Sequence, residues 1–267
     1  EFELGFAFTP LESKWSAVAE ISFDGDQGGA NSDQDDADWE TVTISYQYSD
    51  TLSFTFGNIL SYQGFEAFDA TGLYQFSYAG PANTPLYSAN YAIGASADGS
   101  LGDFDYGVWV GESTATNLLG TALEPSDNSY EYLLAYNGIE NLTVKLILAD
   151  DPNYDTTNVW ASYDHGDFTF AVEHVDTDFV AGAGADLEVT MGMIYYAMGD
   201  AGITFRYADG EIANAGGVFQ DYEKFTISPS YAFSDNVFGL IEFSTEELGT
   251  GANNDSDTAA VELIYSF

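Results

Sequence analysis

Residues 130–148, YEYLLAYNGIENLTVKLIL, contain two amphipathic segments joined by a short polar connection. In each segment large apolar side chains recur at every second position: Tyr130, Tyr132, Leu134 and Tyr136, then Leu142, Val144, Leu146 and Leu148. A period of two is typical of a β-strand with one apolar face. The connection between them, Asn137–Asn141, is short. This stretch therefore predicts a β-hairpin.

The same pattern extends in both directions from this hairpin. It begins with Phe2, Leu4, Phe6 and Phe8 and ends with Ala259, Val261, Leu263, Tyr265 and Phe267. Two further examples are Tyr87–Ile93 and Leu187–Tyr195, with Leu187, Val189, Met191 and Met193 on the apolar face of the latter. We count about 15 such segments and no long amphipathic helix. The sequence predicts an all-β chain with a single domain over residues 1–267.

Composition excludes several classes of protein. The net charge of −40, from 44 acidic and 4 basic residues, argues against a nucleic-acid partner, because phosphate binding needs clustered Lys and Arg. There is no cysteine, hence no disulfide or thiolate metal site. The acidity has two candidate causes, a hollow barrel that spreads its charge over wet loops and adaptation to a saline habitat.

Alternation fits both a soluble β-sandwich and a membrane barrel, but the lengths of the connections separate the two. Short connections are expected at 10–12, 50, 98–103, 137–141, 164–167, 198–201 and 234–236. Long ones are expected near 24–38, 60–86, 112–128, 149–157, 176–186, 209–221 and 245–256. Short periplasmic turns at one rim and long extracellular loops at the other are the plan of an outer-membrane barrel.

Aromatic residues support the same interpretation. Phe8 and Trp15 flank the first short connection, and Tyr163 and Phe168 flank a later one, as in the aromatic girdle at a membrane interface. The last strand ends in Phe267, which is typical of bacterial outer-membrane proteins. We therefore predict a transmembrane antiparallel up-and-down β-barrel in the bacterial outer membrane.

The number of strands raises a question of parity. Single-chain bacterial barrels have an even number of strands with both ends periplasmic, whereas the count here is odd. The first visible strand runs into a short turn, so an ascending strand before it would bring the total to 16. A missed or wrongly divided strand would also restore the parity.

With 16 strands, the longest connection, 60–86, follows the fifth strand. In this architecture the chain resembles the 16-stranded general diffusion porins, and Phe56–Ala67 is similar to the corresponding stretch of OmpL-like β-barrel porins. The resemblance implies a water-filled channel for passive diffusion of small hydrophilic solutes, with residues 60–86 folded inward as a constriction. It also implies a homotrimer in outer-membrane lipid, with small residues such as Ala17, Ala19, Ala89 and Ala95 at the interface.

The resemblance also implies which residues form the constriction. Acids on the inward loop, here Glu66 and Asp69, would face the bases Lys145, Arg206 and Lys224 on the polar strand faces, and would set a transverse field across the throat. The alternative is that each base pairs with an acid, since a buried charge needs a partner. The predicted lumen acids are Glu131, Glu173, Glu188, Glu242 and Glu262.

These acids outnumber the bases, so we expect the channel to prefer cations. In the loops, Asp24, Asp26, Asp35 and Asp36 offer the oxygen ligands of Ca²⁺; the alternative is a solvated acidic loop. We expect no other cofactor and no catalysis, since the chain has two histidines and no Gly-x-Ser-x-Gly motif. The competing function is a substrate-specific or plugged barrel with a structural or adhesive role.

Overall fold

The computed structural model describes residues 2–23, 37–67, 72–81, 84–87, 91–113, 128–179, 186–213, 219–249 and 255–267. Its strands are β1 (Phe2–Phe8), β2 (Trp15–Phe23), β3 (Ala37–Ser49), β4 (Leu52–Leu60), β5 (Tyr91–Leu101), β6 (Phe104–Glu112), β7 (Asn128–Ile139), β8 (Leu142–Asp151), β9 (Tyr154–His165), β10 (Phe168–Phe179), β11 (Leu187–Met198), β12 (Ala201–Ala213), β13 (Phe219–Ser234), β14 (Val237–Leu248) and β15 (Ser256–Tyr265). No helix within these ranges is long and apolar enough to cross a membrane.

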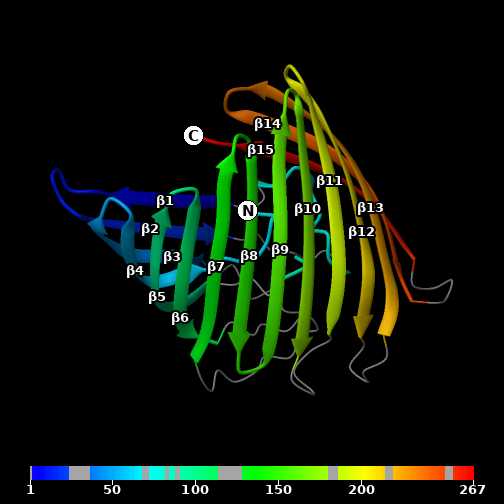
Figure 1. Ribbon diagram of the computed structural model, residues 1–267. Helices are drawn as coiled ribbons and strands as arrows, with labels where there is room; N and C mark the ends of the chain where they lie inside the picture. Colours follow the sequence, from blue (N-terminus) through cyan, green and yellow to red (C-terminus); the bar gives the residue numbers. More distant parts are fainter. Residues whose placement is uncertain are drawn as a thin grey trace.

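The strands form one antiparallel sheet in which each strand pairs with the next along the chain (Figure 1). This order confirms the predicted all-β, up-and-down architecture with 15 visible strands. Within the described residues β1 and β15 do not pair, although the Phe2 and Phe267 rings stack with centroids 6.1 Å apart. A total of 16 strands stays a prediction, as does the single domain.

Tight turns connect the strands at one rim. Gly166 and Gly199 adopt φ of 60° and 68° in two of them, a conformation that glycine reaches without strain. One expected connection is wrong: residues 149–157 are not a long loop. Instead β8 and β9 are joined by Pro152 and Asn153 alone, because both strands continue to the opposite rim. A second difference is that β5 begins at Tyr91, and Tyr87 belongs to the preceding connection.

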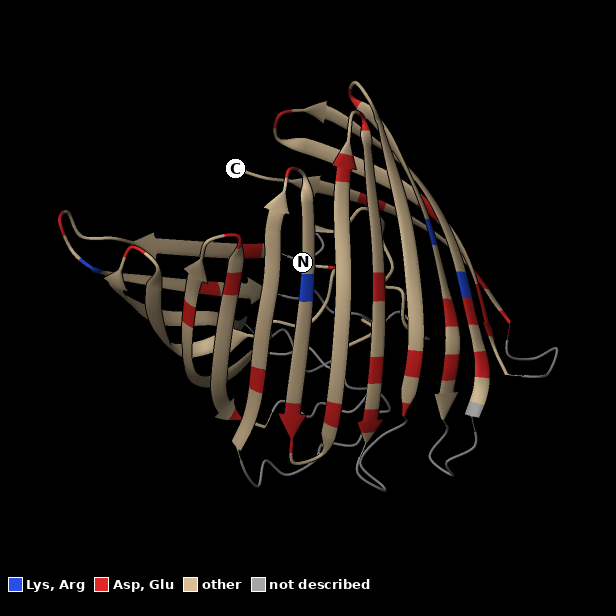
Figure 2. Ribbon diagram, in the orientation of Figure 1, with Lys and Arg blue, Asp and Glu red and all other residues tan. Residues whose placement is uncertain are grey.

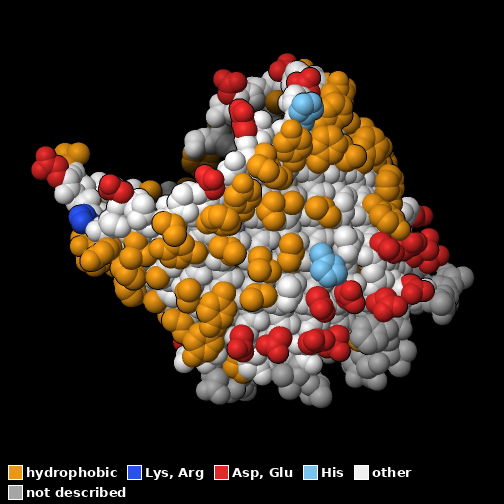
Figure 3. Space-filling view, viewed as in Figure 1, with side chains coloured by type: hydrophobic (Ala, Val, Ile, Leu, Met, Phe, Trp, Pro, Cys, Tyr) orange, Lys and Arg blue, Asp and Glu red, His pale blue; other side chains and the backbone are white. Residues whose placement is uncertain are grey.

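The outward face of the sheet is apolar over most of its height. Tyr106, Leu134, Leu146 and Val159 lie opposite one another on four successive strands. Tyr106 and Leu134 are 41% and 48% exposed, which is far outside the range of a soluble core. Figure 3 shows hydrophobic side chains spread over this surface. An apolar exterior is what a barrel presents to lipid.

Near the rim opposite the tight turns, the outward face becomes acidic (Figure 3). We call this surface the outer acidic belt and define it by Asp150, Asp155, Asp176, Asp178, Glu188, Asp209, Glu211, Asp221, Glu223 and Glu247. Glu188 lies directly opposite both Asp176 and Glu211 and is exposed. Its prediction as a lumen acid is therefore wrong, because β11 turns Leu187 and Val189 inward and Glu188 outward.

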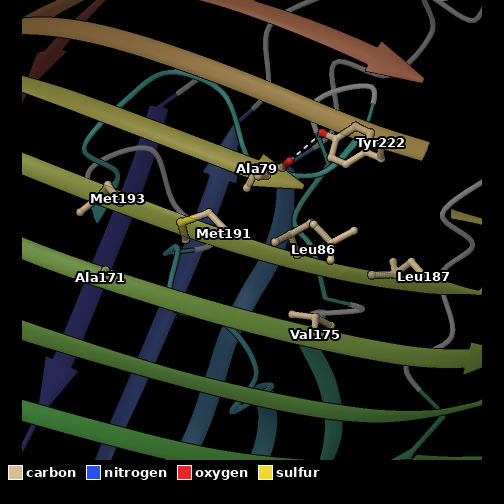
Figure 4. Close-up of a cluster of buried hydrophobic side chains, with 10 residues drawn as sticks. Ala79, Leu86, Ala171, Val175, Leu187, Met191, Met193 and Tyr222 are labelled. Atoms are coloured by element: carbon tan, nitrogen blue, oxygen red, sulfur yellow. Dashed lines mark hydrogen bonds between the residues drawn. The ribbon is translucent and has the colours of Figure 1, made fainter. Parts of the chain in front are cut away.

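The inward face of β11 belongs to a buried apolar cluster (Figure 4). Val189 and Met191 of β11 pack with Ala79 and Leu86 from the connection between β4 and β5, and all four are fully buried. The interior of the sheet thus contains a folded segment with its own core against the wall.

Candidate functional site: the inward segment and its wall

The inward segment comprises the described residues between β4 and β5: 61–67, 72–81 and 84–87. Gly64 allows the chain to turn sharply, because its φ is 94° and a Cβ at this position would lie 2.0 Å from the Tyr87 ring. The Gly64 N–H donates to Asn158 Oδ1 at 3.0 Å on β9. The Tyr87 hydroxyl donates to the Glu66 carbonyl within the segment. These contacts fix the turn against the wall.

A buried ion pair attaches the segment to β12. The Arg206 guanidinium contacts the Glu66 carboxylate, and the two side chains are 1% and 2% exposed. Arg206 also donates to Ser77 Oγ, to the Tyr78 carbonyl and to Thr226 Oγ1, each at 3.0 Å.

Glu66 also has partners within the segment. Its carboxylate accepts hydrogen bonds from Gln75 Nε2 and the Ala79 N–H, both at 2.7 Å. A buried charge pair is tolerated when its remaining hydrogen-bonding capacity is satisfied in this way.

Carboxylates of the wall hold the backbone of the segment. Glu131 on β7 accepts from the Tyr62 N–H at 2.7 Å and from Ser61 Oγ at 2.6 Å. Glu173 on β10 accepts from the Phe65 N–H at 3.0 Å, and Glu242 on β14 from the Ser77 N–H at 2.8 Å. Three of the predicted lumen acids therefore face inward but are buried as hydrogen-bond acceptors for the segment.

Lys224 and Tyr222 on β13 complete the attachment. Lys224 Nζ donates to the Tyr78 carbonyl at 2.7 Å and lies 3.6 Å from the Glu246 carboxylate. The Tyr222 hydroxyl donates to the Ala79 carbonyl at 2.7 Å (Figure 4). The segment thus lies against the inner faces of β10–β14, while its first residues contact β7.

The pairing changes the expected electrostatics of the throat. Arg206 and Lys224 are both paired, as the alternative expects, but their partners are Glu66 and Glu246 rather than the predicted lumen acids. Because the Glu66 carboxylate contacts Arg206 directly at the wall, the two charges do not face each other across an open throat, and this arrangement does not fit the predicted transverse field. Glu262 lies on the inner face of β15, opposite Leu240. Asp69 and the Ca²⁺ candidates Asp24, Asp26, Asp35 and Asp36 lie outside the described residues, as does Ala89.

Lys145 on β8 has a different environment. It lies on the inner face, partly exposed, and its ammonium is 4.8 Å from the centre of the Trp160 ring on β9. In the described part of the chain it forms no ion pair. The Trp160 ring in turn contacts Phe65 of the segment edge to face, with centroids 5.6 Å apart.

The side of the segment away from β10–β14 meets polar groups of the early strands. The Tyr62 hydroxyl donates to Asp98 on β5, and burial together with this hydrogen bond raises the pKa of the Tyr62 phenol. Further along the wall, Ser45 and Thr55 share a hydrogen bond of 2.9 Å and remain partly exposed. The inner surface is therefore buried where the segment covers it, whereas some polar side chains of the early strands stay partly exposed.

Several residues of this arrangement were not predicted from the sequence, notably Asn158, Trp160 and Tyr222. For Trp160, one feature could have identified its partner: Pro152-Asn153 as a two-residue turn sets the register that places it opposite Lys145. For Tyr222 we see no comparable feature, since its partner Ala79 is 143 residues away.

The chain matches no known protein-family profile, and no curated protein matches it in sequence. Solved structures do match. An anion-selective porin from Comamonas acidovorans has a TM-score of 0.66 and 16% identity, over 99% of this chain and 85% of that one. The in-vitro folded outer membrane protein OmpT of Vibrio cholerae, in its trimer form, has a TM-score of 0.63 and 13% identity, over 98% and 89%.

The similarity extends to a third solved structure, that of Pseudomonas aeruginosa OccK3, with a TM-score of 0.61 and 14% identity, over 95% of this chain and 74% of that one. The strand order and the apolar exterior agree with an outer-membrane barrel fold. The chain has the fold of the bacterial outer-membrane porins, an antiparallel up-and-down β-barrel.

Proposed function

We propose that the chain forms a water-filled channel for passive diffusion of small hydrophilic solutes across the outer membrane. One observation carries this proposal: the inward segment covers the inner faces of β10–β14, whereas polar side chains on the inner faces of β3, β4 and β6 stay partly exposed. Glu173, Arg206 and Glu242 are at most 1% exposed, whereas Ser45, Thr55 and Asp105 on the inner faces of β3, β4 and β6 remain partly exposed.

The channel prefers cations in this proposal. Asp98 and Asp105 are partly exposed carboxylates on the inner face, and the wall offers Lys145 as the base without an ion pair among the described residues. Figure 2 shows further acidic residues toward the rim opposite the tight turns, but those of the outer acidic belt face away from the lumen. Carboxylates along a pore favour cations, and the effect declines as salt screens them. The Comamonas relative in fold is anion-selective, so the sign of the selectivity needs measurement.

The proposed assembly is a homotrimer in outer-membrane lipid. Ala17, Ala19 and Ala95 lie on the outer faces of β2 and β5, where small side chains permit close contact between subunits. The outer acidic belt lies on β8–β14. Subunits that meet through the outer faces of β2–β5 would therefore avoid electrostatic repulsion between their belts. The OmpT structure in trimer form offers a precedent for this fold.

A channel is favoured over an enzyme by the placement of the two histidines. His165 lies at a tight turn, and His174 lies on the outer face, 3.0 Å from Thr190 Oγ1. The competing function is a substrate-specific or plugged barrel with a structural or adhesive role. It predicts a folded protein that does not conduct simple ions.

Conductance of the purified protein in a planar bilayer tests the proposal. Stable steps in KCl, with a reversal potential under a salt gradient that corresponds to cation preference, are expected. Folded protein without conductance would contradict the diffusion channel and favour the plugged barrel. Conductance with an anion-selective reversal potential would retain the channel and overturn the preference.

A further inference from the structure

The four basic residues of the chain have unequal surroundings. Arg206 and Lys224 are buried against the inward segment and hold Glu66 and Glu246. Lys14 lies in an exposed turn and donates to the Tyr48 carbonyl at 2.9 Å. Within the part of the chain that the structure describes, Lys145 is therefore the base on the inner wall that forms no ion pair.

The ammonium of Lys145 is placed by an aromatic ring rather than by a carboxylate. Trp160 lies directly opposite Lys145 across β8 and β9, with its ring 4.8 Å from Nζ. A cation over an aromatic face is attracted by the ring but keeps its charge and its three N–H donors. The ring itself is held edge to face by Phe65, whose N–H is bound by Glu173.

The nearest strands supply no competing carboxylate at contact distance. Asp105 on β6 lies opposite Ala135 on β7, and Ala135 in turn lies opposite Lys145, so one strand separates the two charged residues. Two strand spacings put the two backbones about 10 Å apart. Asp105 also accepts a hydrogen bond from Asn137 Nδ2 at 2.7 Å. Among the described residues the partly exposed ammonium thus has no carboxylate partner within ion-pair distance.

We propose that Lys145, positioned by Trp160 and Phe65, is a binding station for the carboxylate or phosphate of small organic solutes that pass through the channel. This inference rests on the proposed function, since a solute reaches the inner wall only through an open lumen. An anionic group gains a charge-assisted hydrogen bond at one point of a wall that otherwise repels it. The channel would then admit organic anions and zwitterions despite its overall preference for small cations.

The test compares wild type with Lys145→Gln, Lys145→Arg and Lys14→Gln in planar bilayers. Lys14→Gln is the matched control, because it removes one positive charge outside the lumen. Added potassium acetate or potassium phosphate is expected to reduce the wild-type single-channel current in a saturable way. Lys145→Gln should abolish this reduction and raise the cation-to-anion permeability ratio several-fold, whereas Lys145→Arg and Lys14→Gln should preserve both wild-type values.

Each outcome has a separate meaning. A reduction by acetate alone assigns the station to carboxylates, and a reduction by phosphate alone assigns it to phosphates. Equal behaviour of wild type and Lys145→Gln, with both proteins folded by their heat-dependent gel mobility, overturns the inference while the channel itself stands. A wild-type protein that does not conduct overturns the proposed function instead. As a second probe, Trp160→Leu keeps the charge but removes the platform and is expected to weaken the reduction.

Discussion

The inner faces of β10–β14 and of β2–β4 belong to one sheet but differ in how far their side chains are exposed to solvent. The first is sealed under the inward segment, and Val189, Met191 and Arg206 are at most 1% exposed there. The second keeps polar side chains such as Ser45 and Thr55 in partial contact with solvent. A segment folded into a barrel thus turns part of the lumen into a protein core, where apolar residues and paired charges replace a wet surface.

The largest expected effect comes from breaking the ion pair of the sealed half. Arg206→Met leaves the Glu66 carboxylate buried without its cation, a loss of about 3–5 kcal/mol for pairs of this kind. The segment should then leave the wall while the barrel persists. We expect a larger single-channel conductance and new proteolytic cleavage within residues 61–87.

The double variant Arg206→Met with Glu66→Met separates lost charge from lost packing. Since both charges are replaced by apolar side chains, the double variant should recover most of the wild-type resistance to proteolysis within residues 61–87. Wild-type conductance and protection in Arg206→Met alone would mean that the pair does not hold the segment.

A second substitution tests the apolar part of the sealed half. Met191→Ala removes a fully buried side chain from the cluster with Ala79 and Leu86 and should lower the free energy of unfolding by about 2–5 kcal/mol. Urea titration in detergent measures this change, and limited proteolysis reports the release of the segment. Ile194→Ala, on the outer face of the same strand, is the control and should leave the segment protected. Equal protection in Met191→Ala would argue that the cluster does not attach the segment.

The same two regions explain what could be predicted from sequence. Alternation and tight turns depend on neighbours along the chain, so the strand order and the outer face of strands such as β7 followed from them. In β11 the alternation was equally clear, but it does not say which face meets lipid. Met191 points inward because the segment supplies an apolar partner more than 100 residues earlier in the chain. Partner identity at such separations, as in Glu66–Arg206, is not encoded in local periodicity.

A smaller effect is expected from a single hydrogen bond. Tyr222→Phe removes the donor to the Ala79 carbonyl at 2.7 Å and should cost about 1 kcal/mol. Tyr207→Phe is the matched control on the outward face of β12, where the exposed hydroxyl donates to Glu223 at 2.8 Å and water replaces the lost bond. The free energy of unfolding is measured for both variants in parallel. An equal loss of stability in the two would contradict a larger contribution from the buried hydrogen bond.

The smallest effect is expected at the outer acidic belt and has the opposite sign. Glu188 faces Asp176 and Glu211 directly across the two neighbouring strand pairs, and like charges in such positions repel. Glu188→Gln should therefore raise the free energy of unfolding by about 0.2–0.5 kcal/mol at low ionic strength, and the gain should vanish in high salt because exposed charges are screened. The cation-to-anion permeability ratio of Glu188→Gln should equal that of wild type, because the Glu188 side chain lies outside the barrel. Asp105→Asn, on the inner face, should by contrast lower the preference for cations. A change of selectivity in Glu188→Gln would return Glu188 to the lumen and reverse the assignment of the two faces of β11.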